Sequence, residues 1–214
     1  DWLNNMGDWN ISRSRFYGLP LPFYICSKCG KMHVIGSVEE LRKLAVDPVK
    51  VDNIPNLHRP WIDDIKIKCA CGAEVERIPE VGDCWLDAGI TPFSTKKYFT
   101  DKKYFENNFP SDYVCEMIEQ IKLWFYSLLI MSVVLTGKAP YKKIVTHQYV
   151  KDENGNEFHK SGGNSLDADK VANEVGADSI RYLYGSANPN NEMRFGYNLC
   201  DEARRKIMAY WNIY

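Results

Sequence analysis

Two pairs of cysteines place the strongest constraint on how this chain folds. The first pair is Cys26 and Cys29, and the second, Cys69 and Cys71, follows about forty residues later. Thiolates at such short spacing bind zinc tetrahedrally, and the glycine after each pair lets backbone N–H groups face sulfur. We therefore predict one structural zinc site made by all four thiolates. Because four thiolates leave no open position on the metal, the predicted site is not catalytic.

The spacing leaves two alternatives open. The second pair is one residue shorter than the usual C-x-x-C, so the cluster is either a degenerate one without metal or a site completed by His33. The odd total of seven cysteines favours metal binding over a disulfide framework. Between the pairs, Ser37 precedes acidic residues and leucines three apart, which predicts a short capped helix over residues 37–44.

A second informative stretch covers residues 143–167. Its β-branched start, 143–147, predicts a buried strand of an α/β sheet. Residues 152–156 are rich in Asn and Gly, which favour a tight turn. The loop 158–164 is basic and flanked by glycine, so Lys160 and nearby backbone N–H groups are candidates to bind phosphate. A solvated loop with an ordinary lysine is the alternative.

A third stretch, residues 112–136, predicts a short strand and then a long apolar helix that starts at Glu116. Glu116, Gln120 and Trp124 recur every four residues, so on a helix they share one face and converge on one ligand. A carboxylate and an amide near the helix start suit an ammonium group. The alternative is a capped, solvated first turn with a core tryptophan.

These stretches, in this order, resemble class I aminoacyl-tRNA synthetases, most closely the isoleucyl type. Residues 8–22, DWNISRSRFYGLPLP, are similar to the W-x-I-S-R-x-R-x-W-G-x-P-x-P signature that follows the editing domain of isoleucyl and valyl synthetases. The lysine loop, followed by Asn164 and G-A-D-x-x-R from Gly176, resembles the K-M-S-K-S region. Residues 116–125 resemble the family's E-G-x-D-Q-x-R-G-W-F, and residues 83–89 resemble D-x-W-x-D-S-G.

The resemblance implies an α/β fold: the second half of a class I synthetase Rossmann-like nucleotide-binding fold, with an inserted zinc ribbon and the start of a C-terminal helical region. We expect four parts. Residues 1–23 return the chain to the catalytic domain, 24–80 form the zinc-ribbon insertion, and 81–185 form the second half of the catalytic domain. Residues 186–214 form a stem-contact linker with the first helix of a tRNA-binding domain, which we expect to start at Asp201.

Site residues follow from matching this chain to the family position by position. The resemblance implies a catalytic role for Lys160 and Ser161, and Lys160 falls on the lysine that holds the triphosphate. It implies ATP binding by His147, Lys160, Gly162, Gly163 and Asn164. It implies amino-acid binding by Glu116, Glu119, Gln120, Trp124 and Trp85. The metal ligands would be Cys26, Cys29, Cys69 and Cys71.

The match has departures at both substrate sites. Glu157 stands where the family's first lysine usually stands, and His159 stands where its first serine stands. In the helix stretch, Met117 replaces glycine and Lys122 replaces arginine. These changes keep three readings open: an isoleucyl enzyme, a valyl or leucyl type, or a divergent zinc-ribbon paralogue that binds RNA or a protein partner without catalysis.

The implied reaction joins isoleucine to ATP, accompanied by Mg²⁺, as an aminoacyl adenylate and then transfers it to tRNA. No H-I-G-H sequence occurs in the chain, and the editing domain would precede residue 1. We therefore expect a fragment that does not activate amino acids alone. A net charge of −1 means that tRNA contact has to use a local patch. No apolar run of roughly 18 residues is evident, so we expect a cytoplasmic protein without membrane contact.

Overall fold

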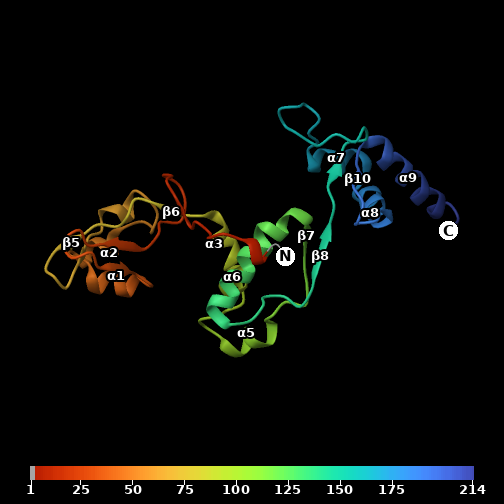
Figure 1. Ribbon diagram of the computed structural model, residues 1–214. Helices are drawn as coiled ribbons and strands as arrows, with labels where there is room; N and C mark the ends of the chain where they lie inside the picture. The colour runs from red at the N-terminus through yellow and green to blue at the C-terminus, as the bar shows by residue number, and fades with distance from the viewer. Residues whose placement is uncertain (1–2) are drawn as a thin grey trace. The chain divides into compact units, whose positions relative to one another are not determined.

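The structure, a computed structural model, describes residues 3–214 (Figure 1). Residues 1 and 2 of the predicted return segment lie outside the described part. The chain divides into two compact units. The first unit comprises the described residues up to Asn107 together with Trp124–Lys138, and the second comprises Asn108–Leu123 and Ala139–Tyr214. Each unit is described by itself.

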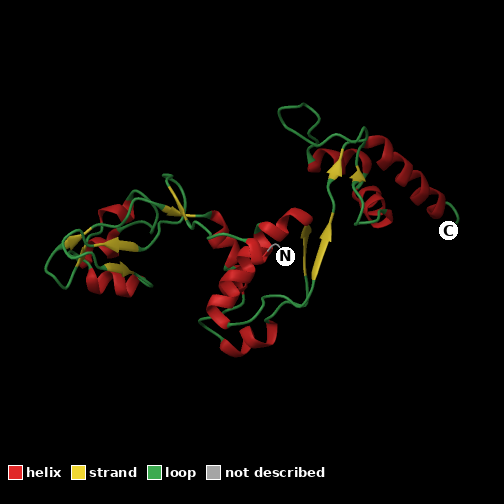
Figure 2. Ribbon diagram, in the orientation of Figure 1, coloured by secondary structure: helices red, strands yellow, loops and turns green. Residues whose placement is uncertain are grey.

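The first unit contains two short β-hairpins (Figure 2), and one cysteine pair lies in the turn of each. Strand β2 (Phe23–Ile25) pairs antiparallel with β3 (Met32–Val34), and β4 (Ile67–Lys68) pairs antiparallel with β5 (Glu74–Val75). The chain between the hairpins forms α1 (Val38–Leu44), α2 (Pro48–Asn53) and the 3₁₀ helix η2 (Trp61–Asp64). The 24–80 segment thus carries its own helices and strands.

These elements enclose one apolar core. Its buried residues are Tyr24, Cys26, Ile35, Leu41, Ala45, Val51, Ile62, Ile65, Ile67, Cys69 and Val75. The predicted helix is confirmed as α1, because the Ser37 hydroxyl accepts a hydrogen bond from the Glu40 N–H at 3.1 Å and satisfies a donor of the first turn. The core includes one cysteine of each pair, so the sulfur cluster and the apolar core are continuous.

A buried arginine joins the two ends of the 24–80 segment. The side chain of Arg77 is 1% exposed and donates to the carbonyl oxygens of Leu21, at 3.2 Å, and Glu80, at 2.8 Å. It also donates to the Asp63 carboxylate through Nε, at 3.1 Å, and through Nη2. Asp63 in turn accepts from Arg59 Nε at 2.6 Å. The buried charge is therefore both paired and hydrogen-bonded, as burial of a guanidinium requires.

A buried carboxylate organises the chain on either side of this segment. Strand β1 (Ser12–Arg13) pairs antiparallel with β6 (Val81–Gly82), and Asp83 follows directly with 4% exposure. The Asp83 carboxylate accepts from Trp9 Nε1 at 2.9 Å and from Arg13 Nη2 at 2.5 Å. It also caps α3 (Cys84–Gly89) by accepting from the Trp85 N–H at 3.2 Å. The two sequence signatures at residues 8–22 and 83–89 are thus joined by one side chain.

Helix α3 packs against α6 (Trp124–Thr136), and the two lie side by side in Figure 1. The contact is close because Gly89 has no side chain: a Cβ at this position would lie 2.8 Å from the Ser127 carbonyl oxygen and 2.8 Å from Met131 Cγ. The remaining helical elements of this unit are η1 (Leu3–Asn5), α4 (Thr91–Thr95) and α5 (Lys102–Asn108), the last of which ends at the boundary between the units.

The second unit contains two parallel strand pairs. Strand β7 (Val114–Met117) pairs with β8 (Ile144–His147), and β9 (Val150–Lys151) pairs with β10 (Met193–Arg194). The 3₁₀ helix η3 (Ile118–Lys122) follows β7, and the helices of the unit are α7 (Ala168–Val175), α8 (Ala177–Ser186) and α9 (Tyr197–Trp211). Its core is formed by the buried or half-buried residues Val171, Val175, Cys200, Leu166, Ile180, Leu183, Phe195 and Tyr197.

The prediction of one helix starting at Glu116 is wrong. Glu116 lies in β7, and the long helix α6 begins only at Trp124. The strand continues through Met117 because it pairs with β8, and the backbone of Leu123, with φ −118° and ψ −101°, interrupts helical geometry before α6. Glu116, Gln120 and Trp124 therefore do not share a helix face.

Two further expectations need correction. Strand β8 forms as predicted, but Ile144 and Val145 remain 44% and 43% exposed, because in the described chain β8 pairs only with β7. The C-terminal helix begins at Tyr197, four residues before the predicted start at Asp201.

One stretch, Ile118–Thr136, is long and apolar enough, by length and composition, to cross a membrane. We had expected the chain to contain no such stretch. The stretch combines η3 with α6 and carries two charged residues, Glu119 and Lys122. Helix α6 alone has 13 residues, fewer than the roughly 20 that a spanning helix needs. Helix α6 packs against α3, whereas Val133, Val134 and Leu135 near its end are exposed.

We predict opposite effects of alanine at two helical glycines. Gly89→Ala should lower the free energy of unfolding by about 1–3 kcal/mol, because the new methyl group meets the α6 backbone. Gly185→Ala in α8 should raise it by up to about 1 kcal/mol, since no atom lies within 4 Å of the new Cβ and alanine favours helix. Urea denaturation measures both, and a neutral Gly89→Ala would contradict the close approach of α3 to α6.

Asp63 should make stability depend on pH. Burial acts to raise the pKa of Asp63, but hydrogen bonds from Arg77 and Arg59 outweigh it and hold this pKa below its ordinary value of 3.8. A carboxyl whose folded pKa is lowered stabilises the fold above its unfolded pKa, and this stabilisation is lost as the pH falls toward the folded pKa.

Asp63→Asn should therefore lower the free energy of unfolding at pH 7 by about 1–3 kcal/mol. The difference from wild type should shrink as the pH falls below about 4. Denaturant titrations at several pH values measure this difference. The matched control is Asp64→Asn, which alters an exposed neighbour. An equal loss for both variants would contradict the assignment.

Candidate functional site

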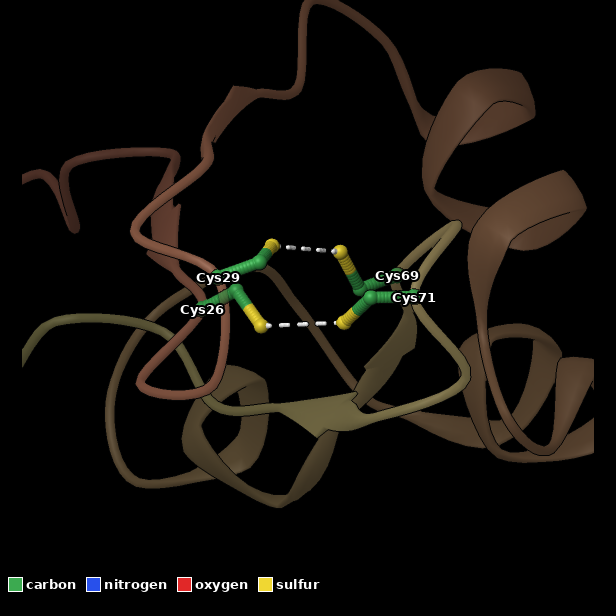
Figure 3. A group of neighbouring side chains, drawn as sticks. All are labelled: Cys26, Cys29, Cys69 and Cys71. Atoms are coloured by element: carbon green, nitrogen blue, oxygen red, sulfur yellow. Dashed lines mark hydrogen bonds between the residues drawn. The ribbon is translucent and has the colours of Figure 1, made fainter.

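The four cysteines converge on one point. Cys26 and Cys29 lie in the turn between β2 and β3, whereas Cys69 and Cys71 lie in the turn between β4 and β5 (Figure 3). The Sγ atoms of Cys26 and Cys71 are 3.6 Å apart, and those of Cys29 and Cys69 are also 3.6 Å apart. All four sulfurs lie within 4.8 Å of one another.

The two turns use the same backbone device. The Gly30 N–H donates to the Cys26 carbonyl oxygen at 2.8 Å, and the Gly72 N–H donates to the Cys69 carbonyl oxygen at 2.9 Å. Both glycines have positive φ, 72° and 83°, a conformation that side chains disfavour. The first hydrogen bond spans four residues and the second spans three, so the second turn is one residue tighter, as its C-x-C spacing requires.

The sulfur arrangement fits a tetrahedral metal ion. With metal–sulfur distances of about 2.3 Å, the sulfurs of a tetrahedral zinc site lie about 3.8 Å apart. The observed 3.6 Å pairs agree with this geometry. His33 lies beside the cluster, with Nε2 3.4 Å from Cys69 Sγ, but it is not one of the converging group. Its position suits a second-layer hydrogen bond to sulfur better than a ligand.

The four thiols also influence one another's ionisation. The backbone N–H of Cys29 lowers the pKa of Cys26 to about 7. For Cys29, the backbone N–H of Lys31 acts to lower the pKa, but the adjoining thiols of Cys26 and Cys69, together with burial, raise it to about 11. One thiolate thus opposes ionisation of the next, so that full ionisation of the cluster requires a positive ion at its centre.

Other predicted site residues meet at the carboxyl edge of the β7–β8 pair. In this parallel register Glu116 lies opposite Thr146, and Met117 lies opposite His147. Helix η3 follows β7 at once and carries Glu119 and Gln120. Because parallel strands end at the same edge, residues from two distant stretches are brought together there. In open α/β sheets this is the edge at which ligands bind.

A tyrosine that we did not predict joins the two strand ends. The Tyr149 hydroxyl, two residues after β8, donates a hydrogen bond to Oε1 of Glu119. This hydrogen bond is the largest cause that raises the pKa of Tyr149 to about 12. His147 Nδ1 lies 3.0 Å from the Gln148 carbonyl oxygen. The only sequence signal for Tyr149 was its position just beyond a predicted strand end.

A cavity of about 280 Å³ lies next to His147 within the second unit. It is lined by His147, Gln148, Val150, Tyr184, Ala187, Asn188, Pro189, Asn191 and Met193. The Gln148 N–H donates to the Pro189 carbonyl oxygen at 2.9 Å, which ties the end of β8 to the segment after α8. His147 thus borders a concave surface with both polar and apolar walls.

The two tryptophans predicted for amino-acid binding belong to the first unit. Trp124 begins α6, and its Nε1 donates to the Ala88 carbonyl oxygen at 3.0 Å, which joins α6 to α3. Trp85 lies on α3 and is half-buried. Glu116, Glu119 and Gln120 belong to the second unit. The predicted amino-acid-binding set is therefore divided between the two units.

Asp152 holds together the lysine loop, residues 158–164, and the turn that precedes it. Its carboxylate accepts from the N–H groups of Asn154, at 3.0 Å, and Asn156, at 2.8 Å. It also accepts from the side-chain amides of Asn156, at 3.3 Å, and Asn164, at 3.2 Å. The Asn156 N–H is the largest cause that lowers the pKa of Asp152. The turn predicted at residues 152–156 is confirmed, with Gly155 at φ +90°.

Asn164 closes the loop. Besides its contact with Asp152, its side chain donates to the Glu157 carbonyl oxygen at 2.8 Å and accepts from the His159 N–H at 2.9 Å. The Gly162 N–H donates to the His159 carbonyl oxygen at 3.1 Å, and the Gly163 N–H donates to that of Lys160 at 3.4 Å. In this conformation, Gly162, Gly163 and Asn164, which were predicted to bind ATP, donate hydrogen bonds inside the loop.

Lys160 and Ser161 lie on the outside of this loop and are exposed. Within residues 3–214, the Lys160 ammonium makes no hydrogen bond or ion pair. Glu157 and His159 approach each other instead, with Oε2 and Nε2 3.4 Å apart. The structure therefore presents the predicted phosphate-binding lysine as an accessible, unpaired cation of the described chain.

Comparison with known proteins identifies the family. The family model for tRNA synthetases class I (I, L, M and V) matches residues 1–196. An isoleucine–tRNA ligase from Thermus thermophilus is 40% identical over 217 residues, covering 100% of this chain and 21% of the relative. One from Methanothrix thermoacetophila is 38% identical over 215 residues, covering 100% and 20%. Isoleucine–tRNA ligase 2 of Bacillus cereus is 40% identical over 210 residues, covering 97% and 20%.

Solved structures agree on the fold. A ternary complex of a LeuRS with tRNA and LeuAMS from Agrobacterium radiobacter superposes with a TM-score of 0.69 at 23% identity, covering 96% of this chain and 27% of that one. Methionyl-tRNA synthetase of Mycobacterium tuberculosis in complex with methionyl-adenylate gives a TM-score of 0.51 at 18% identity, covering 65% and 26%. The chain spans about a fifth of the length of its curated relatives.

The family match extends over nearly the whole chain, and the folds of both solved structures are those of class I synthetases. The resemblance seen in the sequence is thereby confirmed, and the chain belongs to the class I tRNA synthetase family.

Proposed function

We propose that this chain is part of an isoleucine–tRNA ligase, in which it helps to activate isoleucine with ATP and to transfer it to tRNA. The observation that carries the proposal is that β7, which contains Glu116, and β8, which ends at His147, terminate at one carboxyl edge, with Glu119 on η3 directly after β7. This edge is where α/β sheets bind ligands. The names of the similar ligases support isoleucine as the amino acid.

In the proposed reaction, the isoleucine carboxylate attacks the α-phosphorus of ATP, and pyrophosphate leaves. A hydroxyl group of tRNA then takes the acyl group from the resulting aminoacyl adenylate, and AMP leaves. Glu116 supplies a negative charge and Gln120 an amide for the substrate ammonium group. For Trp85 and Trp124, which belong to the first unit, a role in amino-acid binding rests on the sequence resemblance alone. Residues that bind the amino acid accelerate the reaction mainly by holding the two reactants in the attacking geometry.

Lys160 neutralises charge on the phosphates, and Ser161 lies beside it. A fixed positive group near departing pyrophosphate stabilises the charge that develops in the transition state. Mg²⁺ bound to ATP contributes the same chemistry. Gly162 and Gly163 donate their N–H groups inside the loop, so they reach phosphate only if the turn opens. Lys160, which is exposed, needs no such rearrangement.

The cysteine cluster is proposed to hold one structural Zn²⁺ in a zinc-ribbon insertion. The support is the spacing of the four sulfurs, their mutual effect on ionisation, and their position on the turns of two hairpins. Because the cluster is continuous with the apolar core of the 24–80 segment, bound metal stabilises the folded insertion directly.

One observation favours a second candidate, a divergent synthetase relative that binds RNA or a protein partner without catalysis. Glu157, at the position of the family's first lysine, places a carboxylate 3.4 Å from His159 on the phosphate-binding loop. A negative charge there opposes phosphate binding. The same zinc-ribbon fold serves either function, so activity separates the two.

We predict isoleucine-dependent ATP–pyrophosphate exchange by the longest natural polypeptide that contains these residues. Lys160→Ala should slow this exchange by about 100- to 1,000-fold, the usual cost of removing one group that stabilises transition-state charge. Lys170→Ala, which removes an exposed lysine of α7, is the matched control and should leave the rate unchanged.

Valine, leucine and methionine are tested in parallel. If exchange is faster with valine or leucine than with isoleucine, that amino acid and not isoleucine is the substrate. No exchange with any amino acid, in folded protein that contains zinc and retains tRNA binding, would establish the non-catalytic candidate instead.

We also predict that each chain binds one zinc ion, which elemental mass spectrometry measures. Cys29→Ser and Cys71→Ser should each weaken zinc retention and lower the thermal unfolding temperature, because each removes one of four ligands. Cys115→Ser is the control, since Cys115 is exposed on β7 and lies outside the cluster. Folded protein that retains its stability in excess chelator would contradict a structural metal.

A further inference from the structure

Helix α9 lacks a cap of its own. The residue before its first turn is Gly196, which has no side chain to accept hydrogen bonds from the free N–H groups at a helix start. The partner comes instead from the lysine-loop turn. Glu153 Oε1 accepts from the Leu199 N–H at 3.1 Å, and Oε2 accepts from the Asn198 side-chain amide at 2.8 Å. A residue 46 positions away in sequence thus caps α9.

Gly196 leaves the space that this contact requires. A Cβ on Gly196 would lie 2.3 Å from Cγ and 2.5 Å from Cδ of Glu153. The backbone of Gly196 is extended, with φ 174°, so any residue can adopt it and the requirement is one of space alone. The turn and the helix start are also joined through backbone, because the Phe195 N–H donates to the Lys151 carbonyl oxygen at 2.8 Å.

Glu153 is adjacent to the residue that organises the lysine loop. The Asp152 carboxylate holds the turn and, through Asn164, the closed form of the loop around Lys160. The next carboxylate along the chain holds the start of α9. One short turn therefore connects the conformation of the lysine loop with the position of a helix that begins after residue 196, where the family match ends.

We propose that Glu153 is a positioning residue that couples the lysine loop to helix α9. Ordering of α9 by a bound partner stabilises the loop conformation, and ordering of the loop by nucleotide stabilises the start of α9, because the two effects share one coupling free energy. The effect on catalysis rests on the proposed function. The coupling itself is a property of the fold and is measured without activity.

Hydrogen exchange at single amides tests the coupling in the 214-residue chain. Glu153→Ala should reduce protection of the Leu199 amide by about tenfold, the effect of losing one helix cap. It should also reduce protection at Asn156 and His159 in the loop by several-fold. Glu202→Ala, which removes an exposed carboxylate from α9 itself, is the matched control and should leave the loop unchanged.

A second variant separates coupling from simple capping. In Glu153→Ala/Gly196→Ser, the serine provides a local cap for α9, and the atoms that crowd Gly196 have been removed. We expect protection at Leu199 to recover while protection of the loop stays low. Recovery of the loop together with the helix would show that Glu153 acts only as a cap and would overturn the proposal, as would an unchanged loop in Glu153→Ala.

Pyrophosphate exchange in the longest natural polypeptide then gives the catalytic consequence. Both Glu153 variants should lower kcat several-fold with a smaller change in the KM for isoleucine, because the lysine loop and not the amino-acid site is disturbed. If the wild-type polypeptide shows no exchange at all, the proposed function fails, and the hydrogen-exchange result still decides the coupling. Unchanged kcat in an active enzyme would reject the catalytic role of the coupling.

Discussion

Parallel pairing of β7 with β8 is the interaction on which the candidate catalytic site depends. Thirty residues of sequence separate the paired positions Glu116 and Thr146, and the ladder of backbone hydrogen bonds brings the carboxyl ends of the two strands to one edge. The same ladder keeps Glu116 in an extended strand and moves the start of α6 to Trp124. The Tyr149–Glu119 hydrogen bond then fixes the two segments just beyond the ladder.

The 24–80 segment is held together by a different kind of interaction. Two hairpins meet through sulfur at one end, and a buried guanidinium, Arg77, connects backbone carbonyls and a carboxylate at the other. Between them lies an apolar core that includes Cys26 and Cys69. Each end depends on groups that are costly to bury alone and favourable to bury together.

The sequence was informative where the signal is local. The Ser37 cap and the turn at residues 152–156 each depend on residues a few positions apart, and both form as predicted. The four cysteines of the two pairs also converge. The sequence signatures also indicated the class I synthetase family correctly. The helix predicted from Glu116 failed because spacing of four residues describes a helix only if the backbone is helical, and strand pairing decided otherwise.

Non-local contacts could not be predicted in this way. Tyr149 is distant in sequence from Glu119, and Glu153 is distant from the helix that it caps, so neither pair leaves a periodic pattern. Asn164 was assigned to ATP by position in the family, whereas its three hydrogen bonds in this conformation lie within the loop. These hydrogen bonds depend on which side chains the folded chain brings close together.

The contact between Glu153 and α9 also limits how modular this region is. The family match ends at residue 196, which makes that position an obvious place to divide one domain from the next. Yet the acceptor lies on one side of this boundary and its donors, Asn198 and Leu199, lie on the other. If the helical region were exchanged between relatives, the residue that supplies the loop carboxylate would have to be exchanged with it. The structural unit that includes α9 therefore extends beyond the boundary at residue 196.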